Sequence, residues 1–309
     1  MINITRKNAV RLTAGCKVNL FLRIVCRRSD GYHELETLFL PLSAPNDTLH
    51  VGLRADGTGI RLTCSNPELE GGTNLIVKAY EAFGLRTGFT PGLDVHLEKR
   101  IPMGAGLGGG SADAAAFLAH LNAIAGGKAL TEDELTALGA RLGADVPYFL
   151  RHGLRGEPAL ARGIGEVLSP ARVELGGYSL VLVCPAEHVS TSWAYREWDR
   201  LHPEKTCAEA RLPVLTAAVR EASNAFCPET TILANDFEEA VFPGFPGLER
   251  IKGCLIELGA AHAVMSGSGA AIFALYRSAD VAQEACATLK RRITASSVFQ
   301  FPCWGVAKW

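Results

Sequence analysis

Several features that mark other classes of protein are missing from this 309-residue sequence. It has no run of about 20 apolar residues, so it predicts no transmembrane helix. Its first ten residues lack the apolar segment of a secretory signal peptide. Neither sign of charge is in excess, because 31 Lys and Arg residues are balanced by 32 Asp and Glu residues, which gives a net charge of −1. We therefore expect a cytoplasmic protein with neither nucleic acid nor a membrane as a partner.

Patterns typical of zinc sites and disulfide frameworks are missing as well. None of the nine cysteines forms a C-x-x-C pair, and no two of the eight histidines lie four residues apart. An odd number of scattered cysteines is typical of free thiols in a reducing compartment. The sequence thus predicts free cysteines, and it identifies no metal ligands.

The most informative stretch runs from Lys99 to Asp113 and reads KRIPMGAGLGGGSAD. An alternating, strand-like segment (93–98) precedes it, and a helical pattern (113–125) follows it. Glycines let the backbone approach a ligand closely. The first turn of a helix offers unpaired N–H groups and the positive end of a dipole. A glycine-rich loop between a strand and a helix therefore predicts an anion site, most often for phosphate.

Two common phosphate loops fit this stretch poorly. The P-loop pattern is absent, because no Lys follows the glycines. Gly104, Gly106 and Gly109 match G-x-G-x-x-G, but the dinucleotide fingerprint also needs a second strand that ends in an acidic residue. A second helix follows instead, with Thr131 and Glu134 as its predicted capping box. A dinucleotide-binding oxidoreductase remains an alternative.

The segment from Pro102 to Ser111 closely resembles the ATP loop of the GHMP kinases, which include galactokinase, homoserine kinase and mevalonate kinase. The resemblance implies an α+β fold of two domains with the active site in the cleft between them. Residues 1–160 would form the N-terminal domain, with the ATP loop and the catalytic residues. Residues 161–309 would form a ferredoxin-like α/β sandwich. ATP as phosphoryl donor, together with Mg²⁺, is implied as well.

The resemblance also implies the ATP-binding residues. Asn74 corresponds to a position near adenine, although it is equally suited to cap the helix that follows it. Ala112 replaces the second serine of the usual GGGSS, so Ser111 is left as the hydroxyl of the loop. The expected ATP-binding residues are Asn74, Lys99, Pro102, Met103, Gly104, Ala105, Gly106, Leu107, Gly108, Gly109, Gly110, Ser111 and Ala112.

Two residues are implied to be catalytic. Lys17 and Asn19 share one face of the alternating segment 11–25. Its AGCKVNLFL stretch resembles the opening strand of the GHMP kinases, whose lysine is catalytic. Without the resemblance, Lys17 would be interpreted as an exposed lysine on an edge strand. Asp145 is a lone acid in apolar surroundings. Burying a carboxylate there costs free energy unless it is ion-paired, so such a residue is a candidate for a functional role. It resembles the aspartate of the GADVP motif, the proposed catalytic base.

The substrate is indicated by the pattern RxDGYHxL at residues 28–35. It is typical of a branch of the family that acts on a methylerythritol carrying cytidine diphosphate. There the tyrosine packs on cytosine and the histidine hydrogen-bonds its edge, whereas outside this family both would be ordinary turn residues. A second glycine turn at 266–269 is similar to a motif that faces phosphates and substrate. The expected substrate-binding residues are Asn19, Tyr32, His33, Tyr195, Gly267, Ser268 and Gly269.

Taken together, the resemblance implies ATP-dependent phosphorylation of the 2-hydroxyl of that substrate, a small molecule, in the non-mevalonate route to isoprenoids. Asp145 would accept the hydroxyl proton, and Lys17 would hold Asp145 ionised. Three alternatives remain open at this point: the oxidoreductase, a nucleotide-binding regulator without catalysis, and a kinase of a different small alcohol.

Overall fold

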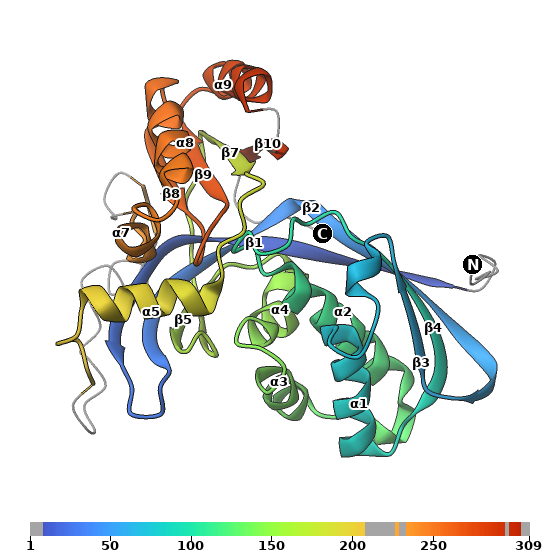
Figure 1. Cartoon of the computed structure of the whole chain (residues 1–309). Coiled ribbons are helices and arrows are strands. Elements are labelled where there is room, and N and C mark those ends of the chain that lie inside the picture. Colours follow the sequence, from blue (N-terminus) through green and yellow to red (C-terminus); the bar gives the residue numbers. More distant parts are fainter. Residues whose placement is uncertain (1–8, 208–225, 229–232, 294–296, 304–309) are drawn as a thin grey trace.

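The computed structural model describes residues 9–207, 226–228, 233–293 and 297–303 (Figure 1). Its strands form a six-stranded and a four-stranded sheet. Helices pack on both sheets, which gives the α+β class that the resemblance implies.

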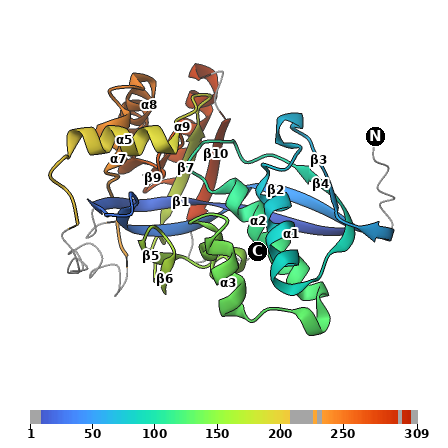
Figure 2. The same cartoon turned by 60° about the horizontal axis from the view of Figure 1, so that its bottom comes forward.

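Two long antiparallel strands run across the middle of the molecule, β1 (Val10–Arg27) and β2 (His33–Thr58) (Figures 1 and 2). An Asp-Gly turn, which residues Asp30 and Gly31 favour, joins them. The Asp30 carboxylate accepts the N–H of Tyr32 at 3.1 Å, and Gly31 has a φ of 86°. Only glycine enters that left-handed region without steric cost. This turn sets the register that places both strands beside the site described below.

The larger sheet is completed by β3 (Ile60–Cys64), β4 (Pro91–Glu98), β5 (Ala159–Gly163) and β6 (Val167–Pro170). Its strand order is β3-β4-β2-β5-β6, and β1 pairs with β2. It packs against α1 (Leu75–Thr87), α2 (Gly109–Ile124), α3 (Glu132–Ala140) and α4 (Val146–Arg151). Three short 3₁₀ turns lie at Pro67–Leu69, Gly126–Lys128 and Gly153–Arg155. The capping box predicted at Thr131 and Glu134 is confirmed at the start of α3.

The smaller sheet has the order β10-β7-β9-β8, with every neighbouring pair antiparallel. Its strands are β7 (Tyr178–Cys184), β8 (His262–Met265), β9 (Ile272–Tyr276) and β10 (Ser297–Cys303). Helices α5 (Thr191–Leu201), α7 (Phe237–Val241) and α8 (Pro246–Glu257) lie between β7 and β8, and α9 (Ala279–Arg292) lies between β9 and β10. This is a β-α-β-β-α-β connection.

The hydrophobic core has three parts, of which one joins the two sheets. The first lies between the larger sheet and α1–α4, and the second lies under the helices of the smaller sheet. In the third, Val18 and Leu20 of β1 pack with apolar residues of β7 and β9. Strand alternation turns Lys17 and Asn19 to the opposite face. The fold therefore buries one face of β1 between the sheets and leaves the other face for polar chemistry.

Two strand predictions need correction. Alternation along residues 11–25 predicts Phe21 on the face of Lys17, but the register shifts between Asn19 and Phe21, and Phe21 packs in the third core at 1% exposure. A β-bulge of this kind adds a residue and reverses the faces beyond it. The pattern of residues 46–66 predicts further short strands. Residues 46–58 instead continue β2, because β1 and β4 pair with them, and only Ile60–Cys64 forms a separate short strand.

The prediction that the cysteines are all free is wrong, because Cys26 and Cys207 form a disulfide. Their Cα atoms lie 5.2 Å apart across a sequence separation of 181 residues. The segment after α5 runs beside the end of β1, where the backbone of Arg27 exchanges hydrogen bonds of 2.8 Å with Lys205 and Cys207. Sequence spacing cannot show this pair, since the contact depends on where α5 ends in space.

The proposed division between residues 160 and 161 falls within β5, which pairs with β2, and the chain leaves the larger sheet after β6. The division itself stays a prediction. Within the ranges that the structure describes, no helix is both long and apolar enough to cross a membrane.

Candidate active site

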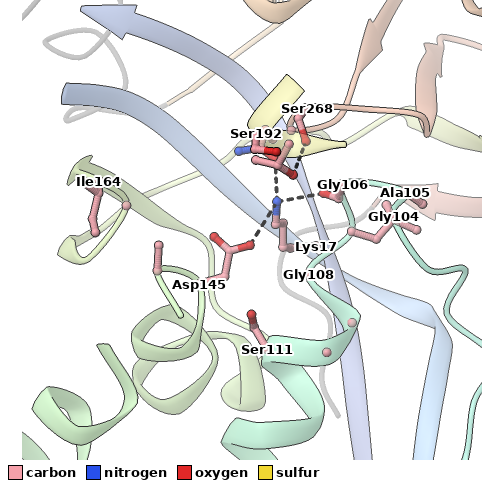
Figure 3. A pocket seen from close by; sticks show the side chains of 18 of the residues that line it. Lys17, Gly104, Ala105, Gly106, Gly108, Ser111, Asp145, Ile164, Ser192 and Ser268 are labelled. Atoms are coloured by element: carbon pink, nitrogen blue, oxygen red, sulfur yellow. Dashed lines mark hydrogen bonds and ion pairs between the residues drawn. The ribbon is translucent and has the colours of Figure 1, made fainter. Parts of the chain in front are cut away.

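A cavity of about 1030 Å³ lies where the glycine-rich loop, β1, β2, α5 and the turn at 266–269 meet (Figure 3). Pockets for one small molecule usually have volumes of roughly 300–1,000 Å³. The cavity lies at the upper end of that range, and its walls come from the larger sheet, from the glycine-rich loop, and from the helices and the glycine turn attached to the smaller sheet.

One wall is the glycine-rich loop that leads into α2. Gly108 stands at the N-cap with a φ of 72°, and no side chain caps the first turn of this 16-residue helix. Gly109, Gly110 and Ser111 all border the cavity. An uncapped helix start offers N–H donors and positive potential, which suit phosphate.

The glycine-rich loop is joined directly to the second glycine turn. The carbonyls of Gly104 and Ala105 accept the N–H groups of Ala270 and Ala271 at 3.3 and 3.1 Å. A Cβ on Gly106 would lie 2.0 Å from the carbonyl oxygen of Ser266, so only glycine allows this approach. Two turns about 160 residues apart in sequence thereby form one surface.

Lys17 lies at the centre of the cavity, between Asp145 and Gly106 (Figure 3). Its Nζ is 2.8 Å from the Asn19 side-chain oxygen, 2.9 Å from the Gly106 carbonyl and 3.6 Å from the Asp145 carboxylate. Lys17 is 3% exposed. A buried ammonium group is tolerated only when it is paired and hydrogen-bonded, and here oxygen atoms meet that need. Lys17 and Asp145 are thus brought together as the sequence predicted.

Asn19 fixes the position of the lysine. Its amide NH₂ donates to Thr37 Oγ1 at 2.7 Å, and Thr37 in turn donates to the Phe21 carbonyl at 2.6 Å. Because the NH₂ is occupied there, the amide oxygen faces Lys17. Asn19 therefore acts on the lysine, in addition to its predicted place beside the substrate.

Lys99 lies below the glycine-rich loop rather than free in the cavity. Its ammonium pairs with Asp47 and, at 2.9 Å, with Asp113. Burial raises the pKa of Asp113 to about 7, although Lys99 lowers it. One oxygen of Asp113 has no hydrogen-bond partner within the described residues. Lys99 supports the base of the loop, and its predicted contact with ATP stays a prediction.

The far end of the cavity is lined by His33 and Tyr195. The rings stack with centroids 4.4 Å apart and an interplanar angle of 19°. His33 is 6% exposed, whereas Tyr32 at the rim is 59% exposed. The structure therefore brings Tyr195 to His33, and a base held between Tyr32 and Tyr195 stays a prediction.

Most of the other predicted residues border the same cavity, with two exceptions. Ala112 is fully buried in the first core, and neither it nor Gly269 lines the cavity. The serine missing at position 112 therefore removes no group from the cavity wall, while Ser111 borders it. Asn74 does cap α1, accepting the Ile76 N–H at 2.9 Å, and it lines the cavity too.

Several residues that line the cavity, on α5 and behind the loop, were not predicted from the sequence. On α5 these are Thr191, Ser192, Arg196 and Asp199, and Asp113 lies behind the loop. The spacing of Asp199, four residues after Tyr195, places both on one helical face and could have indicated it. No cluster of three or more potential metal ligands occurs among the described residues.

A glycine-rich loop that starts a helix, beside a paired lysine and aspartate, suits phosphoryl transfer to a small molecule. Two family models agree with it: the GHMP kinases N terminal domain matches residues 74–153, and the GHMP kinases C terminal matches residues 214–294. A homoserine kinase from Cytophaga hutchinsonii shares the fold at a TM-score of 0.67, with 19% identity and coverage of 97% of this chain and 96% of that one. The fold is that of the GHMP kinases.

More similar proteins narrow the family. A crystal structure of 4-(cytidine 5'-diphospho)-2C-methyl-D-erythritol kinase matches with a TM-score of 0.72 and 34% identity, over 97% of this chain and all of that one. The 4-diphosphocytidyl-2-C-methyl-D-erythritol kinase of Solidesulfovibrio magneticus is 48% identical over 281 residues, 90% of this chain and 92% of the relative. The chain belongs to the family of 4-diphosphocytidyl-2-C-methyl-D-erythritol kinases. This membership rules out the oxidoreductase alternative.

Proposed function

We propose that the protein transfers the γ-phosphoryl group of ATP to the 2-hydroxyl group of 4-diphosphocytidyl-2-C-methyl-D-erythritol, a step in non-mevalonate isoprenoid precursor biosynthesis. The observation that carries the proposal is the Lys17–Asp145 pair, 3.6 Å apart, beside an uncapped glycine-rich loop. We place the reaction in the cytoplasm.

In this reaction the substrate hydroxyl attacks the γ-phosphorus of ATP, the bond to the bridging oxygen breaks, and ADP leaves. Asp145 takes the hydroxyl proton. Lys17 lies within reach of the same centre and stabilises the carboxylate and the developing charge. Backbone N–H groups of Gly109, Gly110 and Ser111 hold the phosphates. The work of the protein is thus mainly positioning and charge neutralisation, as in other phosphoryl transfers.

Mg²⁺ is part of the proposal. This ion usually binds through one or two protein oxygens together with substrate phosphates. The oxygen donors that border the loop, Ser111 and Asp145, fit that chemistry. When bound, the ion would neutralise charge on the phosphates.

The cytidine diphosphate group would extend from the loop towards His33 and Tyr195. Gly267 and Ser268 border the cavity along that path. Aromatic faces and an imidazole supply the stacking and edge hydrogen bonds by which proteins recognise a base.

An ADP-release assay across a panel of alcohols tests the proposal, with methylerythritol offered both free and linked to cytidine diphosphate. We expect ATP-dependent turnover of the cytidine-linked alcohol and little turnover of the free one. Comparable turnover of both, or preference for an unrelated alcohol such as homoserine or mevalonate, would contradict the proposal.

A further inference from the structure

Helix α5 surrounds the imidazole of His33 on three sides. Tyr195, Trp198 and Asp199 are spaced i, i+3 and i+4, which places them on one helical face. Tyr195 stacks on the ring, and Trp198 meets it edge-on at 5.6 Å and 87°. Asp199 Oδ1 lies 2.7 Å from His33 Nε2. The ring therefore has a fixed orientation at the end of the cavity.

Asp199 itself is held in place. Its second oxygen lies 3.6 Å from the Arg27 guanidinium, and its side chain is 22% exposed. The backbone of Arg27 is hydrogen-bonded to the segment that follows α5, and the disulfide between Cys26 and Cys207 closes the same junction. The helix that carries Asp199 is thus attached to the strand end that leads to His33.

This contact determines which ring nitrogen carries the proton. An ionised carboxylate only accepts hydrogen bonds, so the Nε2 atom facing Asp199 must be the donor. In the neutral imidazole the other nitrogen, Nδ1, is then an acceptor. No hydrogen bond to Nδ1 is found within the described part of the chain, and His33 lines the cavity. A neutral His33 therefore presents Nδ1 as an acceptor at this end of the cavity.

We propose that Asp199 is a positioning residue that fixes the tautomer of His33 and so makes the cavity select a base with an exocyclic amino group over one with a carbonyl. The inference rests on the proposed function, in which His33 contacts the base. Cytosine carries an amino group where uracil carries an oxygen. A carbonyl facing the Nδ1 lone pair leaves two acceptors unpaired, which corresponds to about 5- to 150-fold in affinity.

The test compares wild-type enzyme with D199N, using methylerythritol linked to cytidine diphosphate or to uridine diphosphate. The Arg27 guanidinium, which only donates, keeps the asparagine oxygen on its own side, so the NH₂ group faces Nε2 and donates to it. The ring proton then moves to Nδ1, which becomes a donor. We expect the cytidine-to-uridine ratio of kcat/KM to fall at least about tenfold. This fall in selectivity should come from a higher KM for the cytidine-linked alcohol. KM for ATP should change by less than about twofold.

E197Q is the matched control, since it makes the same carboxylate-to-amide change on the same helix. Glu197 pairs with Arg200 at 2.6 Å and does not border the cavity. The cytidine-to-uridine ratio of kcat/KM in E197Q should equal that of the wild type. A ratio in D199N within about twofold of the wild-type value would overturn the inference.

A second measurement needs no substrate. In ¹⁵N-histidine NMR spectra, the His33 signals, identified by their loss in H33Q, should show the proton on Nε2 in wild type and on Nδ1 in D199N. A wild-type proton on Nδ1 would overturn the inference even if D199N failed to fold. Failure of the wild type to phosphorylate the cytidine substrate would instead count against the proposed function, and the NMR result would still decide the role of Asp199.

Discussion

Single residues in this site owe their roles to their immediate partners. Lys17 is a buried cation with oxygen atoms around it, and Asn19 can face it only because Thr37 occupies its NH₂ group. Lys99, a cation a few residues before the glycines whose side chain is 9% exposed, is instead divided between two carboxylates. The two lysines near this loop therefore have different partners.

Asp145→Asn should lower turnover by about 10²–10⁴-fold with ATP affinity intact, because the amide keeps the shape but cannot accept the proton. Steady-state kinetics and ATP titration measure the two effects. Asp133→Asn is the control, since that carboxylate is 89% exposed. If the Asp145 variant loses less than about threefold, Asp145 has a structural role.

The stability of the fold should depend on pH through Asp113. Its folded-state pKa of about 7 is above its ordinary value of 3.8, so the folded protein holds this proton more tightly than the unfolded chain. The resulting stabilisation is complete at low pH and is lost as pH rises through about 7. At about 1.4 kcal/mol per pKa unit, the loss is on the order of a few kcal/mol.

Urea unfolding of wild type and Asp113→Asn between pH 5 and 8 measures this dependence. The difference in unfolding free energy, wild type minus variant, should decrease with rising pH. A difference that stays constant across the range would show that Asp113 does not titrate there.

Tyr195→Ala should raise KM for the cytidine substrate by about 5- to 150-fold, because a base stacked on an aromatic ring gains about 1–3 kcal/mol. KM for ATP should stay nearly unchanged, since the ring stacks on His33 at the end of the cavity away from the loop. Tyr195→Phe keeps the ring and should behave like the wild type. A rise in KM for ATP alone would mean that Tyr195 belongs to the nucleotide site.

At the scale of elements, the glycine-rich loop has to approach several neighbours at once. A Cβ on Gly109 would lie 2.8 Å from Ile101 and 3.0 Å from Lys99, so a larger residue there would disturb the support of the loop. A Cβ on Gly110 would meet only Leu75, at 3.8 Å. Gly110 is therefore the better position for testing the phosphate site alone.

Gly110→Val should weaken ATP binding by tenfold or more while the fold survives, because the new side chain enters the cavity beside the start of α2. Isothermal titration with ATP and thermal unfolding measure the two properties. Gly127→Val, in open space away from the cavity, is the control. Unchanged ATP affinity in a folded Gly110 variant would place the phosphates elsewhere.

At the scale of the whole molecule, several connections hold the two sheets around the cavity. They share the third core, the loop is hydrogen-bonded to the second glycine turn, and Cys26 is linked to Cys207. Beyond Lys17, the N–H of Leu22 also donates to the Ala234 carbonyl, and the N–H of Ile24 donates to the Asp236 carboxylate, both at 2.9 Å. The end of β1 near His33 is thus held by hydrogen bonds and by the one covalent link.

Cys207→Ser should lower the free energy of unfolding by about 2–5 kcal/mol, because a long loop gains freedom in the unfolded chain. Thermal unfolding with and without a dithiol reductant measures the contribution of the disulfide to stability. Reductant should lower the melting temperature of wild type and of Cys254→Ser, but not that of Cys207→Ser. Equal sensitivity of all three proteins would show that the disulfide does not contribute.

Local features of this protein can be predicted from its sequence alone. A glycine-rich loop before a helix, the Asp-Gly turn, the capping box at Thr131 and the shared face of Lys17 and Asn19 all depend on residues within a few positions of one another. Periodicity and turn preferences encode such features directly. The family followed from the same short motifs.

Tertiary structure decided everything that joins distant segments. The bulge that turns Phe21 into the core, the pairing of Cys26 with Cys207 and the placing of Asp199 against His33 each need a partner that is far away in the chain. Ala112 shows the same limit: its motif suggests a phosphate contact, but helix packing buries its side chain. The residue pattern determines which side chains share a face of a helix or strand. Only the packing of helices and strands determines which distant residues contact that face.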